Sequence, residues 1–262
     1  MKRVVPLTKL HGTRNDFVLV DHRDHQFSDY AGLASFLCER RSGVGADGLL
    51  VLLPSDDTDV CMRIFNPDGS EAQMCGNGVR CVAAYLLEEG EPADLHIRTL
   101  AGVIETHAQR DGDRYAVRVT LPAPQIAPAS GIPNAFVVQA GNPNVVIFGD
   151  SLKGADLPAM GPLISSKYEN GANVHVATPC GPRCLEVRHW ERGVGTTMSC
   201  GTGAIAAAAA AIHCGDVQSP VEVIVRGGTL IVEWDGVGDI LLTGKAVRVF
   251  DTTVHYDDHV AD

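Results

Sequence analysis

The chain has 262 residues, of which 45% are hydrophobic and 20% are charged, and its formal net charge is −11 at pH 7. This length allows one large domain or two of ordinary size with a substantial core. No basic cluster interrupts the acidic balance, which argues against a nucleic-acid partner. Residues 1–6 lack the features of a signal peptide, and no apolar run could span a bilayer, so we expect a cytoplasmic protein without a membrane partner.

Short runs with strand character occupy most of the chain, and several alternate apolar with polar residues as half-buried strands do. In chain order the expected strands are 16–21, 49–53, 60–65, 95–99, 103–108, 115–121, 136–139, 145–148, 174–177, 185–190, 221–225, 229–234 and 246–250. A helix is predicted over residues 30–40, where Leu33, Phe36 and Leu37 share a face behind the candidate cap Ser28.

Two further helices are expected over residues 79–87 and 202–213. Both are small and apolar on every side, which is typical of a buried helix, so we expect a curved sheet around each. The sequence thus predicts an α/β (α+β) fold of two pseudo-symmetric lobes, each a mostly antiparallel sheet around a central helix. The proline-rich segment 122–124 separates an N-terminal lobe (1–122) from a C-terminal lobe (123–248), and the tail from about 249 to 262 returns to the first lobe.

A cysteine followed by Gly-x-Gly opens both of these helices, at Cys75 and again at Cys200, about half the chain apart. The amino terminus of a helix lowers the pKa of a thiol placed there, and its unpaired N–H groups hold carboxylates. If both motifs serve one carbon, a thiolate can remove the α-proton from one face while a thiol donates a proton to the other. The result is inversion of that carbon without a cofactor.

Other interpretations of these cysteines compete with this one. A single copy of the motif is more often a buried cysteine at a turn, and the second copy with its matching helix favours catalysis. Neither copy has the glycine spacing of a dinucleotide site, and the spacings Cys75-x5-Cys81 and Cys180-x3-Cys184 do not match zinc motifs, so we expect no metal. The six remaining cysteines are expected to be free thiols, buried as small hydrophobic residues.

Beyond these motifs, the chain resembles the diaminopimelate epimerase family over nearly its whole length. The matching segments are 11–17 (HGTRNDF), 45–49 (GADGL), 65–81 (FNPDGSEAQMCGNGVRC), 141–143 (GNP), 173–174 (NV), 191–195 (ERGVG) and 200–203 (CGTG). The resemblance implies that Cys75 and Cys200 transfer protons without pyridoxal phosphate or metal, and that Asn15 lies near the reacting end. It also implies that the backbone at Gly76, Asn77, Gly201 and Thr202 holds the α-carboxylate, and that the distal amino-acid group is recognised by Asn66, Asn142, Asn173 and Arg192.

Glu191 would bind the substrate ammonium or assist proton exchange between the thiols. Taken alone, each amide is equally explained by a turn or cap, and the charges of Arg192 and Glu191 by the surface. Three positions depart from the family pattern: Asn144 replaces a histidine, Thr196 a glutamate and Arg14 a common glycine. These departures lie near the reacting end, so they bear on rate and substrate more than on the type of reaction.

The implied function is interconversion of LL- and meso-diaminopimelate for the synthesis of lysine and peptidoglycan precursors, in a site that closes where the lobes meet. The departures leave open a racemase of the same fold for another amino acid, such as histidine, or a relative that binds an amino acid without catalysis. The expected partner is a small amino-acid substrate. A homodimer is possible through an exposed strand edge or an apolar lobe face.

Overall fold

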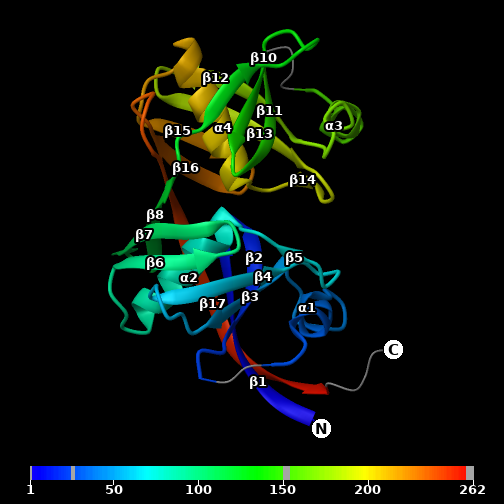
Figure 1. The fold of residues 1–262 in the computed structure, drawn as a ribbon, viewed down its shortest axis with the longest axis vertical. Coiled ribbons are helices and arrows are strands. Elements are labelled where there is room, and N and C mark those ends of the chain that lie inside the picture. The colour runs from blue at the N-terminus through cyan, green and yellow to red at the C-terminus, as the bar shows by residue number, and fades with distance from the viewer. Residues whose placement is uncertain (1, 25–26, 150–153, 258–262) are drawn as a thin grey trace. The chain divides into compact units, whose positions relative to one another are not determined.

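The computed structural model describes residues 2–24, 27–149 and 154–257 (Figure 1). The chain divides into two compact units, one formed by residues 1–119 and 245–262 and the other by residues 120–244. We call them the Cys75 unit and the Cys200 unit after the cysteine that each carries. Each is built mainly of strands, with two helices.

The Cys75 unit contains a sheet and helices α1 and α2 in this order: β1 (Lys2–Gly12), β2 (Asn15–Asp21), α1 (Tyr30–Cys38), β3 (Gly48–Leu53), β4 (Val60–Phe65), β5 (Glu71–Ala72), α2 (Gly76–Glu88), β6 (Asp94–Thr99) and β7 (Gly102–Asp111). Strand β8 (Arg114–Leu121) leads out of it. Strands β2 and β3 pair in parallel, as do β4 and β6, and the pairs β1–β2, β3–β4, β4–β5 and β6–β7 are antiparallel.

The Cys200 unit repeats this topology with β9 (Gln125–Pro128), β10 (Ala135–Ala140), β11 (Asn142–Phe148), α3 (Leu157–Ser165), β12 (Asn173–Gly181), β13 (Cys184–Glu191), β14 (Gly195–Thr197), α4 (Gly201–Cys214), β15 (Val221–Val225) and β16 (Gly228–Glu233). Here β11–β12 and β13–β15 are the parallel pairs, and β10–β11, β12–β13, β13–β14 and β15–β16 are antiparallel. The order of pairings matches that of the Cys75 unit strand for strand.

Strand β17 (Ile240–Asp257) leads back into the Cys75 unit. Its first part pairs with β16 as far as Gly244, and its second part pairs with β1 from Ala246 onward. The expected returning tail ends at residue 262, and its last five residues lie outside the described part of the chain.

Helices α2 and α4 are the buried centres of their units (Figure 1). In α4 the residues from Ala204 to Ala211 are completely buried, and the helix contacts β10 to β13, β15 and β16. Small side chains allow the sheet to approach this helix closely on several sides. The predicted fold, a curved and mostly antiparallel sheet around one central helix in each half, is confirmed.

Several details differ from the sequence prediction. The amino-terminal cap of α1 is Asp29, whose Oδ1 accepts the N–H of Gly32 at 2.8 Å, and not Ser28. The helix also ends at Cys38 instead of residue 40. Strands β1, β5, β9 and β14 and helix α3 were not predicted. Proline obscured two of them: Pro6 in β1 lies where that strand pairs only with β17, and α3 contains Pro162.

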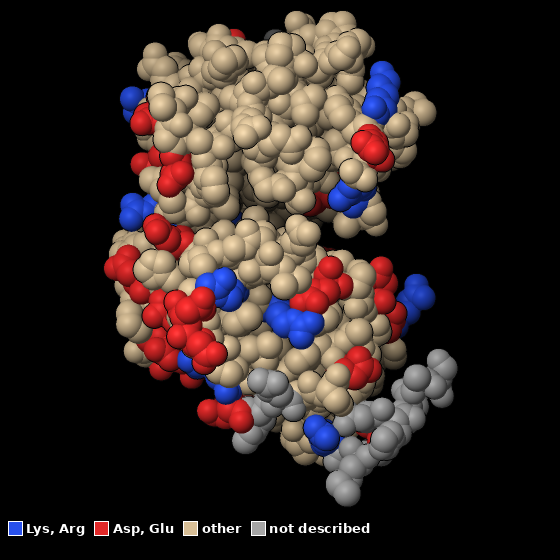
Figure 2. All heavy atoms as spheres, in the orientation of Figure 1, with Lys and Arg blue, Asp and Glu red and all other residues tan. Residues whose placement is uncertain are grey.

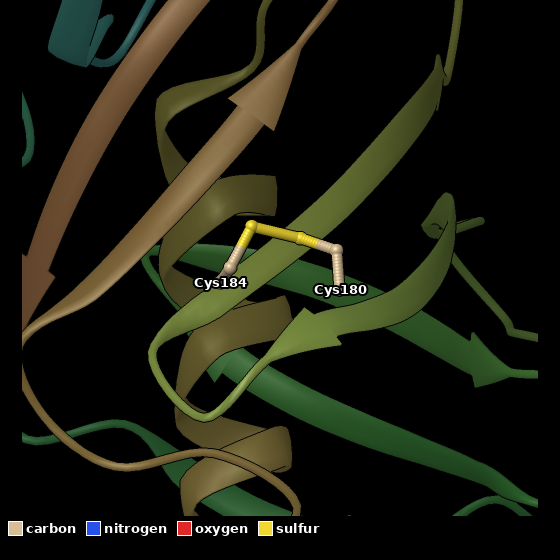
Figure 3. Close-up of a disulfide and its surroundings, with 2 residues drawn as sticks. All are labelled: Cys180 and Cys184. Carbon is tan, nitrogen blue, oxygen red and sulfur yellow. A yellow bond between two sulfur atoms is a disulfide. The ribbon is translucent and has the colours of Figure 1, made fainter.

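The cysteines also correct the prediction. Cys180 and Cys184 form a disulfide at the β12–β13 hairpin, with their Cα atoms 5.1 Å apart (Figure 3). The hairpin brings the two residues within bonding reach, a geometric cause that composition and compartment do not reveal. Of the free cysteines outside the two motifs, Cys38 and Cys81 are buried as expected, whereas Cys61 is half-buried and Cys214 is exposed.

On the face drawn in Figure 2, lysine and arginine side chains lie scattered among acidic ones. Among the described residues, several arginines form ion pairs with acidic side chains, such as Arg23 with Asp21 and Arg248 with Asp251, both at 2.8 Å. None of the helices within the described ranges combines the length and apolar character needed to cross a lipid bilayer.

Candidate active site

Cys75 is the amino-terminal cap of α2. Its backbone is extended (φ −142°, ψ 114°), and its carbonyl accepts the N–H of Val79 at 2.9 Å. The thiol lies 3.8 Å from Oδ1 of Asn15, to which it donates. A Cβ added at Gly76 would meet no atom within 4 Å, so a ligand has room to approach the backbone of this turn.

Asn15 joins the first turn of α2 to the start of β2. Its Oδ1 accepts a hydrogen bond from Nδ2 of Asn77 at 3.0 Å, and its Nδ2 donates to Asp47 at 2.8 Å. The acceptor face of Asn15 is thereby directed at Cys75 and Asn77. Three of the predicted site residues, Asn15, Cys75 and Asn77, are together in this half.

Arg80 was not predicted as part of the site. Its side chain is completely buried, and its guanidinium donates to Oδ1 of Asn77 (2.6 Å), Oγ1 of Thr13 (2.9 Å) and the carbonyl of Gly76 (3.4 Å). All three acceptors are neutral, and Nε has no partner among the described residues. The available signal was a lone arginine in a helix whose other residues predict burial.

Two other predicted or noted residues of this unit occupy turns. Asn66, directly after β4, donates from Nδ2 to Oγ of Ser70 at 2.9 Å, and its N–H donates to the Ser70 carbonyl. Arg14, one of the departures from the family pattern, has φ +64°, a conformation that favours glycine.

Cys200 begins α4 as Cys75 begins α2. Its side chain is 4% exposed, and its Sγ accepts the N–H of Gly203 at 3.4 Å and lies 3.4 Å from Oγ1 of Thr202. The predicted residues Cys200, Gly201 and Thr202 therefore form one turn at the start of the helix.

The environment of Cys200 corrects the expectation that a helix amino terminus lowers the pKa of both thiols. Burial, followed by the negative charge of Glu191, raises the pKa of Cys200 well above its ordinary value. Burial and a carboxylate both disfavour a thiolate. Cys200 is accordingly a protonated thiol at neutral pH.

Glu191 ends β13 and is half-buried beside Cys200, which removes the interpretation of a fully solvated charge. Oγ1 of Thr197 donates to its carboxylate at 2.5 Å, across the pairing of β13 with β14. The neighbouring Thr196, where the family pattern has glutamate, is exposed. Thr197 is a residue that the sequence prediction missed.

Three of the four residues predicted to recognise the distal group, all except Asn66, are linked to Asn144 in the Cys200 unit. Nδ2 of Asn144 donates to the carbonyl of Asn142 at 2.6 Å, and its Oδ1 accepts from Nδ2 of Asn173 at 3.4 Å. Oδ1 of Asn173 in turn accepts the backbone N–H of Arg192 at 3.0 Å, and the Arg192 guanidinium donates to the carbonyl of Asn170. Asn142, Asn173 and Arg192 are thus linked through a completely buried amide.

Each half therefore presents a thiol and the first backbone N–H groups of a helix, with opposite charges nearby. The buried Arg80 cation lies at the first turn of α2, and the Glu191 anion lies beside Cys200. Such a pair can supply one base and one acid for proton transfer at a carbon next to a carboxylate.

The fold recurs in solved structures of other proteins. A PhzF-family phenazine biosynthesis protein from Bacillus anthracis superposes with a TM-score of 0.79 at 19% identity, covering 96% of this chain and 99% of that one. A hydroxyproline epimerase from Agrobacterium vitis gives a TM-score of 0.71 at 16% identity, covering 99% and 93%. At this level of identity the likeness establishes the fold.

Sequence similarity establishes the family. The diaminopimelate epimerase family model matches residues 7–126 and 136–249. The diaminopimelate epimerase of Desulforudis audaxviator is 42% identical over 93% of this chain and 97% of its own length, and that of Moorella thermoacetica is 40% identical over 92% and 96%. The chain belongs to the diaminopimelate epimerase family.

Proposed function

We propose that this chain is an isomerase that interconverts LL-2,6-diaminopimelate and meso-2,6-diaminopimelate by proton transfer between two cysteines. It would serve the synthesis of lysine and of peptidoglycan precursors. The observation that carries this proposal is the pair of matched helix starts, Cys75 on α2 and Cys200 on α4, in a chain of this family. Inversion requires a proton donor and a proton acceptor on opposite faces of the α-carbon, and two thiols meet that requirement.

The α-carboxylate of the reacting centre would be held by backbone N–H groups at Gly76, Asn77, Gly201 and Thr202. These groups lie in the first turns of α2 and α4, where no carbonyl within the helix can accept their hydrogen bonds. Negative charge that develops next to the carboxylate during reaction is stabilised by the same fixed dipoles.

The proposed mechanism gives the two thiols opposite proton states at the moment of reaction. Cys200, with its raised pKa, holds a proton, and Cys75, which donates to Asn15 as a thiol, would give up its proton beside the buried Arg80 guanidinium to act as the base. The Cys75 thiolate takes the α-proton, leaving an electron pair on the α-carbon, and Cys200 donates its proton to that carbon from the other face. The product leaves with inverted configuration, Cys75 as thiol and Cys200 as thiolate, and the protons exchange with water before the next turnover.

The unreacting amino-acid group of the substrate would bind Asn66, Asn142, Asn173 and Arg192, with Asn15 near the reacting end. Amides and a guanidinium can hydrogen-bond both the carboxylate and the ammonium of a fixed stereocentre. Glu191, half-buried next to Cys200, would hold the reacting ammonium or pass protons to and from the thiol.

Solvent deuterium tests the two-thiol mechanism directly. In D₂O the first turnovers from LL-diaminopimelate should give meso product that carries deuterium at the inverted carbon, while unreacted substrate stays protiated. The reason is that the proton removed remains on one thiol and the deuteron comes from the other. Early product that retains the original proton would contradict the mechanism.

Single cysteine variants test each thiol. Cys75→Ala and Cys200→Ala should each reduce epimerisation by roughly 10²–10⁴-fold, because each removes one proton carrier. Cys214→Ala, an exposed free cysteine, is the matched control and should leave the rate unchanged. A chain that only binds an amino acid would show no exchange in any form.

A substrate panel tests the specificity. Diaminopimelate should undergo α-deuteration far faster than histidine, proline or glutamate, none of which offers the second amino-acid group that the distal residues would hold. Turnover of another amino acid without turnover of diaminopimelate would replace the proposed substrate.

We also propose that the enzyme is cytoplasmic and forms a homodimer. The exposed apolar residues Val249 and Phe250 on β17 support self-association. Light scattering at micromolar concentration should give twice the chain mass, and Phe250→Lys should reduce it to the mass of one chain.

A further inference from the structure

Two buried histidines lie beneath the first turn of α4. His175 on β12 and His189 on β13 are partners in the antiparallel register, and they are 0% and 3% exposed. Their rings meet edge to face with centroids 4.9 Å apart and Nδ1 atoms 3.0 Å apart. A Cβ at Gly203 would lie 2.5 Å from the His175 ring, so this ring is in contact with the turn that holds Cys200.

The hydrogen bonds fix where each proton lies. Nδ2 of Asn144 donates to the Asn142 carbonyl, so Oδ1 of Asn144 is the acceptor that faces Nε2 of His175 at 2.9 Å. His175 therefore carries its proton on Nε2, and its Nδ1 accepts from Nδ1 of His189. Burial keeps both rings neutral: it lowers the pKa of His175 well below its ordinary range and that of His189 to about 3.

In the Cys75 unit, aliphatic side chains fill the equivalent position beneath the first turn of the central helix. Gly78, which corresponds to Gly203, has Leu50 at 2.9 Å and Ile64 at 3.8 Å from its added Cβ. Leu50 and Ile64 are register partners on β3 and β4, as His175 and His189 are on β12 and β13. The same position in the repeat is thus filled by an aliphatic pair in one unit and a histidine pair in the other.

The histidine pair is the more costly of the two solutions. Nε2 of His189 is buried and has no hydrogen-bond partner among the described residues, and an unpaired buried acceptor destabilises a fold. A polar pair with an unsatisfied atom, where aliphatic residues pack in the repeat, indicates a role other than packing.

That role is reached through Asn144. Its Oδ1 accepts from both His175 and Asn173, and Asn173 accepts the backbone N–H of Arg192. His175 supplies the shorter of the two hydrogen bonds to this oxygen, 2.9 Å against 3.4 Å. Without it, Oδ1 would have only the long bond to Asn173 and would draw that side chain away from Arg192.

We propose that His175 and His189 are positioning residues that hold the Asn144 amide in one orientation and thereby set Asn173, Asn142 and Arg192 for the distal group of the substrate. The inference rests on the proposed function, since it gives the histidines a task only if those three residues bind substrate. It assigns the histidines no proton-transfer step.

The test replaces the pair by that of the other unit, His175→Leu with His189→Ile. Because Leu50 and Ile64 pack at the equivalent place, this variant should fold. Its KM for diaminopimelate should rise about five- to tenfold, with kcat changed less than about threefold, as expected for the loss of one positioning hydrogen bond. Failure to fold, or an unchanged KM, overturns the proposal.

A conservative variant and a control separate positioning from stability. His175→Gln keeps a donor toward Asn144 and an acceptor toward His189, so its KM should stay within about twofold of the wild-type value. His22→Leu, which removes a buried histidine from the Cys75 unit, should lower the melting temperature without changing KM. A KM for His175→Gln as high as that of the Leu/Ile variant overturns the proposal.

A double-mutant cycle tests the route through Asn144. If the histidines act through this amide, Asn144→Leu combined with the Leu/Ile pair should raise KM no further than the larger single effect. Effects on KM that multiply would overturn the proposal. Asn173→Ala tests the underlying site separately. An unchanged KM in Asn173→Ala would refute the proposed distal site. A raised KM in Asn173→Ala, together with an unchanged KM in the histidine variants, would refute only this inference.

Discussion

Arg80 places a positive charge in the interior of the Cys75 unit, and no carboxylate among the described residues forms an ion pair with it. Its hydrogen bonds go to Asn77, Thr13 and the Gly76 carbonyl, all of which belong to or adjoin the turn that carries Cys75. A buried charge without a partner is costly. The balancing anions available to it are a thiolate at Cys75 and the carboxylate proposed to bind this turn.

Replacing Arg80 by methionine should therefore reduce kcat on the order of 10²-fold, because Asn77 and the turn lose their anchor and the thiolate loses its nearby cation. The rate at which iodoacetamide alkylates Cys75 near neutral pH should fall as well, and peptide mapping would measure it. Arg98→Met, which removes an exposed arginine paired with Asp57, is the control and should change neither quantity. Unchanged Cys75 labelling in Arg80→Met would show that the cation does not act on the thiol.

At Cys200 the charge has the opposite sign, and so does the expected effect of removing it. Glu191 contributes to the raised pKa of this thiol after burial, so Glu191→Gln should lower that pKa. Alkylation of Cys200 should then proceed faster than in the wild type at each pH below the plateau of its rate profile. Glu186→Gln removes an exposed carboxylate on the same strand and should not change the pH dependence of Cys200 alkylation. A profile shifted to higher pH by Glu191→Gln would mean that the carboxylate stabilises the thiolate instead.

The two thiols can be proposed from the sequence because their motif occurs twice and is local in the chain. Asn15 was inferred only through the family resemblance, and the structure has it in contact with Cys75. Arg80 and His175 were not predicted because both are identified by their burial and by partners that the local sequence does not show, such as Thr13 for Arg80 and Asn144 for His175. An arginine in a helix and a histidine in a strand are ordinary until their environments are known.

At the scale of elements, the internal repeat predicts more of the structure than local sequence patterns do. Helix α1 was predicted from its apolar face, whereas its counterpart α3, which also joins two parallel strands, was not. Pro158 and Pro162 lower the helix propensity of this segment, so local sequence patterns do not predict α3. Aligning the two halves at Cys75 and Cys200 would have required a helix before β12.

The β12–β13 hairpin carries a disulfide whose contribution can be measured. A loop as short as that between Cys180 and Cys184 gives a stabilisation of about 2 kcal/mol from chain entropy. Cys184→Ser should therefore lower the free energy of unfolding by about that amount under oxidising conditions and by much less in the presence of a thiol reductant. Cys214→Ser serves as the control. An equal loss under both conditions would place the effect in packing of the side chain instead of the cross-link.

The histidine pair under α4 should make the fold sensitive to acid. In the unfolded chain a histidine titrates near pH 6.5, while burial lowers the folded pKa of His189 to about 3 and that of His175 well below its ordinary range. Between these values the unfolded state binds more protons, so this stability is present above pH 6.5 and is lost as pH falls. At pH 5 the loss from His189 is about 2 kcal/mol, and His175 adds a loss of the same sign.

Urea unfolding at pH 7.5 and pH 5 measures this loss. The variant His175→Leu with His189→Ile should lose markedly less stability between the two pH values than the wild type does. His22→Leu provides a comparison with another buried histidine. An identical pH dependence in the wild type and the Leu/Ile variant would show that the pair titrates normally in the folded protein.

At the scale of the whole molecule, length and composition predict a globular protein with a substantial core. The internal repeat predicts two similar halves. The architecture can be inferred because each half contains a helix of small apolar residues. Such a helix is apolar on every side, so it must be buried, and the surrounding strands supply the sheet that buries it. Neither composition nor the repeat identifies the substrate. The net charge of −11 still constrains how a substrate approaches.

Diaminopimelate carries two carboxylates and two ammonium groups near neutral pH, so its net charge is zero. The field of an acidic protein attracts or repels a ligand over a Debye length of about 10 Å at 0.1 M salt, but it exerts little net force on a neutral zwitterion. We therefore expect kcat/KM to change by less than about twofold between roughly 20 and 200 mM sodium chloride. Steady-state rates at constant pH measure this, with glutamate, a net anion, as the comparison ligand in inhibition assays. A several-fold rise of kcat/KM with salt would mean that the reacting species carries net negative charge, and diaminopimelate in its zwitterionic form would no longer account for the activity.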